Sequence, residues 1–371
     1  MKILSVLGSF KDVYSPIESS ELIKRIILEK DLGYEIEELP MCDGGEYTYE
    51  VLKYHMQCTE ECALNVTSPY GTKRDARYLG IENEAYIISS EILRLYPEED
   101  VYKNPLNLTD YGLGEMIEDA LSKGYDKINL CLGGTSTIGY GMGTAQAMGV
   151  TFFDRTNKEI KEILTPKIYK EIHHVKVKKH YKYEKISFNI INDGITRACD
   201  LETVNPLKIG RTYEQQKDII LRDLNQAAEN IFNLTGKSKE TAYSGNGGCV
   251  YFGMQMLFSL QNYRGASYFS ELFELEQKIM ESDVVITGEG RFDNPHLKKL
   301  PVYISELAQK YNKKLIYICG QTACKKQDFM DEIIVLSDYY REFDTGKYST
   351  TVDKYRDLTV KVLEKKLFEV L

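Results

Sequence analysis

The feature of this 371-residue chain that most constrains its fold is a repeated order of short apolar run, loop and amphipathic segment. At the N-terminus, KILSVLGSF is rich in aliphatic residues and is followed by SPIESSELIKRIILEK, whose apolar residues recur at helical spacing. The same order returns in the last third, where SDVVITGEG and KKLIYICGQ each precede a helical pattern. Strands that alternate with helices predict an α/β protein with a parallel sheet.

The middle of the chain departs from this simple alternation. Residues from about 165 to 195 read as antiparallel strands with one basic, solvent-facing side. A chain of this length with 43% hydrophobic residues can build more than one core. We therefore expect two domains, an α/β domain built from residues 1–75 and 270–371 and an inserted mixed α/β domain at residues 76–269.

Composition excludes several classes of partner and compartment. The formal net charge of −9 disfavours nucleic acid and anionic membranes, which attract basic surfaces. No apolar run approaches the roughly 18 residues of a membrane span, and the start MKILSVLGSFKD is too short for a signal peptide. The eight cysteines show no CxxC spacing, so we expect reduced thiols and a cytoplasmic protein.

Two established nucleotide fingerprints are absent from the sequence. The segment Gly236-Lys237-Ser238 has Ile231 where a P-loop needs its first glycine. The glycines of GYGMGTAQ begin like a dinucleotide loop, but Gln146 occupies the last glycine position. A Walker ATPase and a nicotinamide enzyme are therefore disfavoured.

Four other glycine-rich loops combine glycine with hydroxyl or charged residues: Cys42–Glu46, Gly133–Gly143, Ser244–Gly248 and Thr287–Asp293. Backbone N–H groups exposed by glycines bind anions, and nearby hydroxyl groups add donors. Loops at the carboxyl ends of an open sheet meet in a crevice where ligands bind. Each loop alone is equally consistent with a tight turn, but four together favour a phosphate site.

The sequence also resembles a known family. The segments LPMCDGGEYT, NPLNLTDYGLGEMIEDALSKG, LGGTSTIGYGMGTAQAMG, ACDLETVNPL, SGNGG and SDVVITGEGRFD occur in the order and approximate spacing of the bacterial glycerate kinase family, of the glycerate 2-kinase type. The resemblance implies two α/β domains, one of them flavodoxin-like and built from both termini, with the substrate cleft between them. It also implies phosphorylation of D-glycerate, or a related small hydroxy acid, with ATP.

Phosphoryl transfer needs positioned cations, Mg²⁺ ligands and a base near the acceptor hydroxyl. We expect Asp200, Lys11 and Arg291 to be catalytic, with Asp200 as the base. Asp293 and Glu289 are candidate Mg²⁺ ligands. An N-cap role for Asp200 and a local ion pair between Arg291 and Asp293 stay open as alternatives.

The remaining candidates bind substrate or nucleotide, and they come from the same loops or from positions of the family motifs. They are Ser9, Asp43, Gly44, Gly133, Gly134, Thr135, Ser136, Gly245, Gly247, Gly288, Glu289 and Lys299. A place near the start of a helix would explain a serine at position 9 without a binding role. Likewise, Lys299 could be an ordinary solvent-exposed lysine.

Several polar residues of the family motifs are replaced in this chain. The opening acid is Gly8, Thr-Asn-Asp of the long glycine loop reads Thr137-Ile138-Gly139, and Glu-Met-Ala reads Ser89-Ser90-Glu91. Sites built around such groups discriminate strongly between acceptors. A noncatalytic relative that binds a nucleotide or a small acid is therefore the alternative, and the oligomeric state stays open, a homodimer included.

Overall fold

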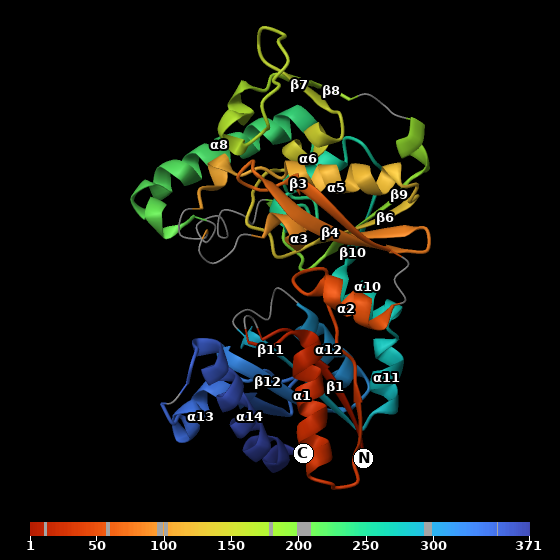
Figure 1. The fold of residues 1–371 in the computed structure, drawn as a ribbon, viewed down its shortest axis with the longest axis vertical. Coiled ribbons are helices and arrows are strands. Elements are labelled where there is room, and N and C mark those ends of the chain that lie inside the picture. The colour runs from red at the N-terminus through yellow and green to blue at the C-terminus, as the bar shows by residue number, and fades with distance from the viewer. Residues whose placement is uncertain are drawn as a thin grey trace. The chain divides into compact units, whose positions relative to one another are not determined.

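The computed structural model describes residues 1–10, 13–56, 60–94, 99, 103–177, 181–198, 209–292, 299–346 and 348–371. Its backbone forms two compact units, which are drawn in Figure 1. The terminal unit comprises Met1–Asp43, Glu50–His55 and Gly265–Leu371, and the inserted unit comprises Gly44–Tyr49 and Met56–Arg264.

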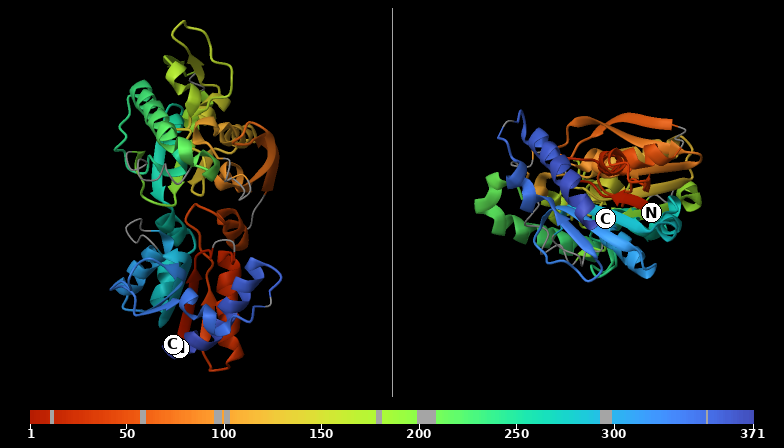
Figure 2. Two further views of the ribbon diagram at one scale, coloured as in Figure 1. Left: turned by 90° about the vertical axis from the view of Figure 1, so that its left-hand side faces the viewer. Right: turned by 90° about the horizontal axis from the view of Figure 1, so that it is seen from below.

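The terminal unit is built on a five-stranded parallel sheet in the order β13-β12-β11-β1-β2. Its strands are β1 (Lys2–Leu7), β2 (Glu35–Glu38), β11 (Val284–Phe292), β12 (Lys314–Thr322) and β13 (Glu332–Val335). Counted along this unit, the order is 2-1-3-4-5, which is that of flavodoxin-like folds. The expected flavodoxin-like α/β domain built from both termini is confirmed, and Figure 2 shows the N- and C-termini close together.

Helices of the terminal unit follow the predicted alternation with strands. They are α1 (Pro16–Glu29), most of α2 (Thr48–His55), α10 (Gly265–Leu272), α11 (Leu275–Glu281), α12 (Leu300–Lys310), α13 (Leu336–Phe343) and α14 (Thr351–Val370). α1 begins with a capping box, because Glu18 N donates to Ser15 Oγ at 3.2 Å and Ser15 N donates to Glu18 Oε2 at 2.9 Å. Its apolar residues Ile23, Ile26 and Ile27 enter one core with strand residues and with α14.

The segment Thr287–Asp293, which we expected to be a loop, is a strand as far as Phe292. β11 keeps its register with β12 through Arg291↔Gln321 and Phe292↔Thr322. Both glycines therefore lie within the strand, and Gly288 has a structural role there. A Cβ at Gly288 would overlap the carbonyl oxygen of Ile318, so only glycine allows the strands this approach.

The inserted unit contains a six-stranded mixed sheet in the order β10-β9-β6-β5-β4-β3. The strands are β3 (Glu60–Thr67), β4 (Lys73–Ile81), β5 (Glu84–Ile88), β6 (Lys127–Leu132), β9 (Ser187–Asn192) and β10 (Leu260–Arg264). β3, β4 and β5 pair antiparallel, whereas β5, β6, β9 and β10 run parallel. Because β3 and β4 belong to this sheet, residues 60–75 lie in the inserted unit rather than in the terminal domain to which we had assigned them.

The helices of this unit are α3 (Ser90–Leu93), α5 (Tyr111–Ser122), α6 (Met142–Ala147), α8 (Lys217–Thr235) and α9 (Tyr251–Met254), together with short 3₁₀ turns. α3 and α5 share a hydrophobic core with this sheet, whereas α6 and α8 share a second core with η2 (Pro166–Glu171). The prediction of antiparallel strands over residues 165–195 is wrong for most of that range. Among the described residues of that range, only β8 (His174–Lys176) pairs antiparallel, with β7 (Thr151–Phe153), while Pro166–Glu171 is the 3₁₀ helix η2. β9 lies between β6 and β10 and pairs parallel with both. Residues on both of its faces are buried, as is usual for a strand inside a parallel sheet.

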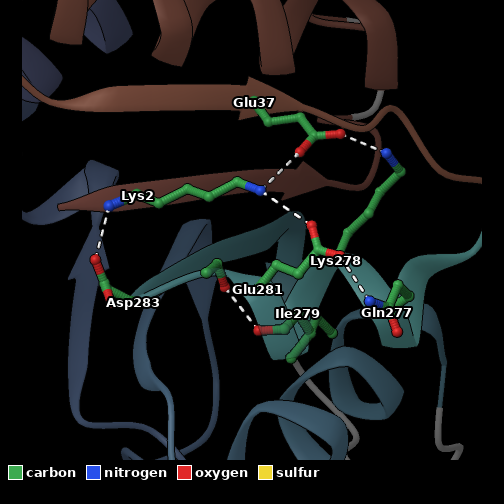
Figure 3. Close-up of polar contacts among 8 residues, drawn as sticks. Lys2, Glu37, Gln277, Lys278, Ile279, Glu281 and Asp283 are labelled. Atoms are coloured by element: carbon green, nitrogen blue, oxygen red, sulfur yellow. Dashed lines mark hydrogen bonds and ion pairs between the residues drawn. The ribbon is translucent and has the colours of Figure 1, made fainter.

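Charged residues tie the chain together near the amino ends of the strands in the terminal unit (Figure 3). Lys2 N donates to Asp283 Oδ2 at 2.8 Å, and Lys2 Nζ lies 3.2 Å from Glu281 Oε2. Glu37 on β2 pairs with Lys278 on α11. These pairs are partly exposed, so each contributes at most about 1 kcal/mol to stability. They join the N-terminal strand to the segment that leads into β11.

Candidate active site

Ser9 and Gly288 lie at the topological switch point of the terminal unit's sheet. In this strand order the chain leaves β1 toward β2 on one side, and β11 lies on the other side. Gly8 N donates to Gly288 O at 2.9 Å, and Gly290 N donates to Ser9 O at 3.0 Å. The carboxyl ends of these two strands therefore lie side by side, at the position where open α/β sheets bind ligands.

Glu289 is the half-buried acid of this strand end. It accepts a hydrogen bond from Tyr317 Oη at 2.6 Å across to β12. Burial and the Glu289 charge raise the pKa of Tyr317 above its ordinary value, so the phenol keeps its proton and donates. Arg291, two residues later, is exposed. An arginine guanidinium can pair with two oxygens of a carboxylate or a phosphate.

Lys299 comes directly before α12 in an extended backbone conformation, and its side chain is exposed. A Cβ at Gly8 would lie 3.8 Å from Pro301 Cγ, so the first turn of α12 packs beside the end of β1. The structure thus brings Ser9, Gly288 and the start of α12 together within one unit. A helix N-terminus beside a strand end favours bound anions.

Three of the four predicted glycine loops gather at the carboxyl ends of the parallel strands in the inserted unit. Gly133 follows β6 directly, and a Cβ there would lie 2.6 Å from Gly45 Cα and 2.7 Å from Asp193 Oδ2. Gly44 has φ +95°, and a Cβ there would lie 3.1 Å from Ile191 O at the end of β9. Only glycines allow the loop around Gly44 and the loop around Gly133 to pack this closely.

Polar groups from neighbouring loops complete this cluster. Ser89 Oγ donates to Gly133 O at 3.1 Å and accepts from Gly133 N at 3.2 Å, which holds the backbone of the loop in place. A Cβ at Gly134, whose φ is +63°, would lie 3.0 Å from Glu46 Cγ. Thr135 and Ser136 follow as half-buried residues, so their hydroxyl groups extend the polar lining.

The third loop, Ser244–Gly248, packs against the same strand ends. A Cβ at Gly247 would lie 2.7 Å from the Leu132 side chain, at the last residue of β6. Asn246 Nδ2 donates to Gly194 O at 2.8 Å, and Gly245 N donates to Thr196 O at 3.1 Å. Gly245 and Gly247 are therefore close-packing positions beside the cluster. Both are buried, in keeping with support of the loop backbone.

The end of the long glycine loop has a different role from the predicted anion site. Gly141 N donates to Asp110 Oδ2 at 2.9 Å and Thr144 N donates to Asp110 Oδ1 at 2.8 Å. Asp110 is 1% exposed. Burial raises the pKa of Asp110, and the N–H groups of Thr144 and Gly141 oppose that shift. The start of α6 thus binds the protein's own carboxylate, and only Gly133–Ser136 stays a candidate for phosphate.

Several predicted residues are not tested by these contacts. Lys11, Asp200 and Asp293 lie outside the described residues. Asp43 is half-buried and ends the first segment of the terminal unit. The acid that directly follows β9 in the structure is Asp193, which sequence reasoning missed. Asp193 could have been recognised from the sequence, because the apolar run SFNII is followed by Asn-Asp. The sequence around Ser89 and Asp110 indicates only that each lies at the start of a helix.

A bound metal would need carboxylate ligands. Within the described ranges, no three His, Cys, Asp or Glu side chains form a group that could hold a metal ion. Kinase Mg²⁺ sites use one or two carboxylates together with substrate phosphates. Glu289 at the end of β11 therefore fits such a site as one ligand. In the same described ranges, no helix is both long and apolar enough to cross a membrane.

Comparison with known proteins agrees with this arrangement. The sequence pattern that describes the glycerate kinase family matches residues 3–338 of this chain. The glycerate kinase of Haemophilus influenzae is 28% identical over 347 residues, which is 89% of this chain and 87% of that protein. The glycerate 2-kinase of Escherichia coli is 27% identical and covers 86% of this chain and 85% of its own length.

A solved structure shares the fold. The crystal structure assigned as glycerate kinase 2 of Salmonella typhimurium LT2 superposes with a TM-score of 0.72 at 21% identity, over 100% of this chain and 98% of that one. Identity with the curated relatives is low, so the chain is a divergent member. It belongs to the glycerate kinase family and is a phosphotransferase with an alcohol acceptor.

Proposed function

We propose that this protein transfers the γ-phosphoryl group of ATP to a hydroxyl of D-glycerate, or of a closely related small hydroxy acid, with 2-phosphoglycerate as the product from glycerate. The observation that carries the proposal is the packing of Gly44–Glu46, Gly133–Ser136 and Ser244–Gly248 at the ends of one set of parallel strands. The name of the Escherichia coli relative, a glycerate 2-kinase, supports the choice of acceptor and product.

The loops of the inserted unit would bind phosphate oxygens. Gly133–Ser136 combines two glycines with two hydroxyl residues, and Ser89 holds its backbone. Backbone N–H groups and hydroxyl groups in such loops are the usual donors to phosphate. Since phosphoryl transfer depends mainly on positioning and charge neutralisation, a rigid loop of this kind suits the reaction.

The terminal unit would supply charged groups. Arg291 would neutralise a phosphate or pair with the acceptor carboxylate, and Lys299, directly before α12, would add positive charge. Lys11, which lies outside the described residues, is given the same role from the sequence alone. Glu289 and Asp293 would hold Mg²⁺, which would neutralise charge on the phosphate oxygens. These assignments extend the sequence resemblance to this chain.

The general base is the remaining assignment. We assign it to Asp200, as the family motif implies, and Asp193 is a second carboxylate at the loop cluster. A base must come within hydrogen-bond reach of the acceptor hydroxyl. The Asp193 carboxylate lies beside Gly133, within the phosphate-binding cluster, so it is placed to hold the acceptor or a metal. The reaction is assigned to the cytoplasm, where ATP is supplied.

A coupled ADP-release assay with ATP, Mg²⁺ and a panel of hydroxy acids tests this proposal. D-glycerate should support turnover, and ³¹P NMR should identify 2-phosphoglycerate as the product. Omission of Mg²⁺ should abolish turnover. Folded protein that binds ATP in calorimetry but phosphorylates no acid of the panel would instead support the noncatalytic binding protein.

A further inference from the structure

A groove between η2 (Pro166–Glu171) and α8 is a part of the inserted unit that the phosphotransferase proposal does not use. It holds a cavity of about 410 Å³ whose polar lining consists of Arg155, Lys170, His173, Gln226, Asn230 and Asn233. A neighbouring cavity of about 350 Å³ shares Lys170 and Gln226 and adds Lys167 and Asp223. Volumes of about 300–1,000 Å³ are typical of small-ligand sites.

The charge of this cavity is positive although the whole chain is acidic. No Asp or Glu is among the described residues that line it. Within the described part of the chain, Arg155 and Lys170 form no ion pair. The Oδ1 atom of the adjacent Asp154 accepts from Thr156 N at 2.8 Å and Lys158 N at 3.0 Å, so this carboxylate is held within its own turn. Two cations among described lining residues that include no acid favour an anionic ligand, although the whole protein carries a net charge of −9.

α8 presents amide groups to the same cavity. Gln226, Asn230 and Asn233 are spaced by four and three residues, so they form one stripe along the helix. Gln226 Nε2 donates to Asn230 Oδ1 at 3.3 Å. The buried stripe of α8, which contains Leu224 and Ile231, fixes the helix in the core. The amide stripe therefore has a set orientation toward the cavity.

The elements that carry the cations are also held firmly. Tyr169, next to Lys170, is fully buried, and its hydroxyl donates to the carbonyl of Gly139. His173 N donates to Phe153 O at 2.8 Å, which ties the end of η2 to β7. The turn after β7 is closed by the hydrogen bonds to Asp154 described above. Groups that are positioned in advance lose little entropy when they bind a ligand.

We propose that this groove binds a small anion that carries a phosphoryl group. The Arg155 guanidinium can pair with two phosphate oxygens, the Lys170 ammonium adds a second charge, and the amide NH₂ groups donate to the remaining oxygens. None of the residues that line the groove belongs to the candidate active site. The site is therefore an addition to the proposed activity and does not depend on it.

Pyrophosphate is the probe for this site, and NMR of the full ¹⁵N-labelled chain is the measurement. We expect saturable shifts of the side-chain NH₂ signals of Gln226, Asn230 and Asn233. The double charge reversal R155E/K170E should weaken this binding by about tenfold or more, because it replaces both attractive charges by repulsive ones. The control K161E/K237E changes the net charge equally at two exposed lysines outside the cavity lining and should change the affinity by less than about twofold.

Three results would contradict the inference: no saturable shifts of these amides, equal binding by R155E/K170E and wild type, or equal weakening by the control. Citrate at the same charge should bind more weakly, and equal binding would contradict the choice of a phosphoryl group. Turnover in the absence of pyrophosphate should be unchanged in R155E/K170E. If pyrophosphate does not bind the groove but turnover is intact, this inference alone is refuted. If pyrophosphate binds the groove but no turnover is detected, the proposed function alone is refuted.

Discussion

The carboxylate of Asp110 occupies the space that a side chain at Gly139 would need, because a Cβ at Gly139 would overlap Asp110 Oδ2. In the family motif this position corresponds to an aspartate, whereas in this chain it is a glycine that packs against Asp110, the residue before α5. The glycine and the buried acid are therefore a matched pair. A larger residue at position 139 would require the Asp110 carboxylate to move.

A double-mutant cycle tests this pairing. Gly139→Ala should destabilise the fold by about 1–3 kcal/mol through overpacking. Asp110→Ala should cost about 1–3 kcal/mol for each buried N–H left unsatisfied. The double variant should cost less than the sum, by about 0.5 kcal/mol or more, since the new methyl group enters the emptied space. Urea denaturation measures the free energy of unfolding of the two single variants and the double variant. Asp126→Ala combined with Gly139→Ala is the control pair, whose costs should add. Additive costs for Asp110→Ala and Gly139→Ala would contradict the pairing.

Asp193→Asn should lower turnover strongly, by about a hundredfold or more if the carboxylate holds the acceptor or a metal. The substitution keeps the size of the side chain beside Gly133, so the fold should be retained. Asp126→Asn, an exposed acid hydrogen-bonded to Asn83, is the matched control and should keep full activity. Equal turnover by wild type and Asp193→Asn would remove Asp193 from the site.

Glu18 gives the fold a pH dependence at the start of α1. Burial alone would raise its pKa, but the Ser15 N–H and the Arg356 guanidinium outweigh burial and hold the pKa below its ordinary value of 4.5. The stabilisation is therefore complete above about pH 4.5 and is lost as the pH falls through the folded-state pKa. Both side chains of the pair are more than a third exposed, so screening limits it to about 0.5–1 kcal/mol.

The measurement is denaturant unfolding of wild type and Glu18→Gln between pH 7 and the acid range. The difference between the two proteins should shrink as the pH falls, while Glu21→Gln, on the same helix, should follow wild type throughout. A difference that stays constant with pH would show that the Glu18 charge does not contribute.

Cys319 should be unreactive in the folded protein. Burial, and next the Glu289 charge, raise the pKa of the Cys319 thiol to about 12, and the side chain is fully buried. Only the thiolate reacts quickly with alkylating reagents. Iodoacetamide at pH 8, followed by peptide mass spectrometry, should modify Cys324, the half-buried cysteine, well before Cys319. Rapid modification of Cys319 in native protein would contradict the burial of β12.

Long periodic elements were predictable from the sequence. The helix of SPIESSELIKRIILEK is confirmed as α1, because its capping box and its apolar spacing agree with the tertiary core. β1 and β12 were equally clear, since buried parallel strands are continuous aliphatic runs. The parallel architecture of the terminal unit followed from that alternation.

Other parts depend on contacts that a single sequence does not reveal. The glycines of TGEG suggested a turn, but Gly288 is needed because Ile318 O approaches it from the neighbouring strand. β3 and β4 were missed because apolar and polar residues alternate only weakly along them. For this reason the first predicted domain boundary, between residues 75 and 76, fell too late in the chain. Among the candidate residues, Gly44 and Gly133 were found from their loops, whereas Asp193 and Asp110 are recognised only through the glycines that they contact.

The most direct test of the account is the reaction itself, followed by ³¹P NMR with the purified full-length chain, ATP, Mg²⁺ and D-glycerate. The account predicts that the γ-phosphate signal of ATP decays while the signals of ADP and 2-phosphoglycerate rise in equal amounts, and that Asp193→Asn slows this transfer. Loss of ATP to inorganic phosphate alone, or a folded protein that leaves ATP intact with every hydroxy acid tried, would contradict it.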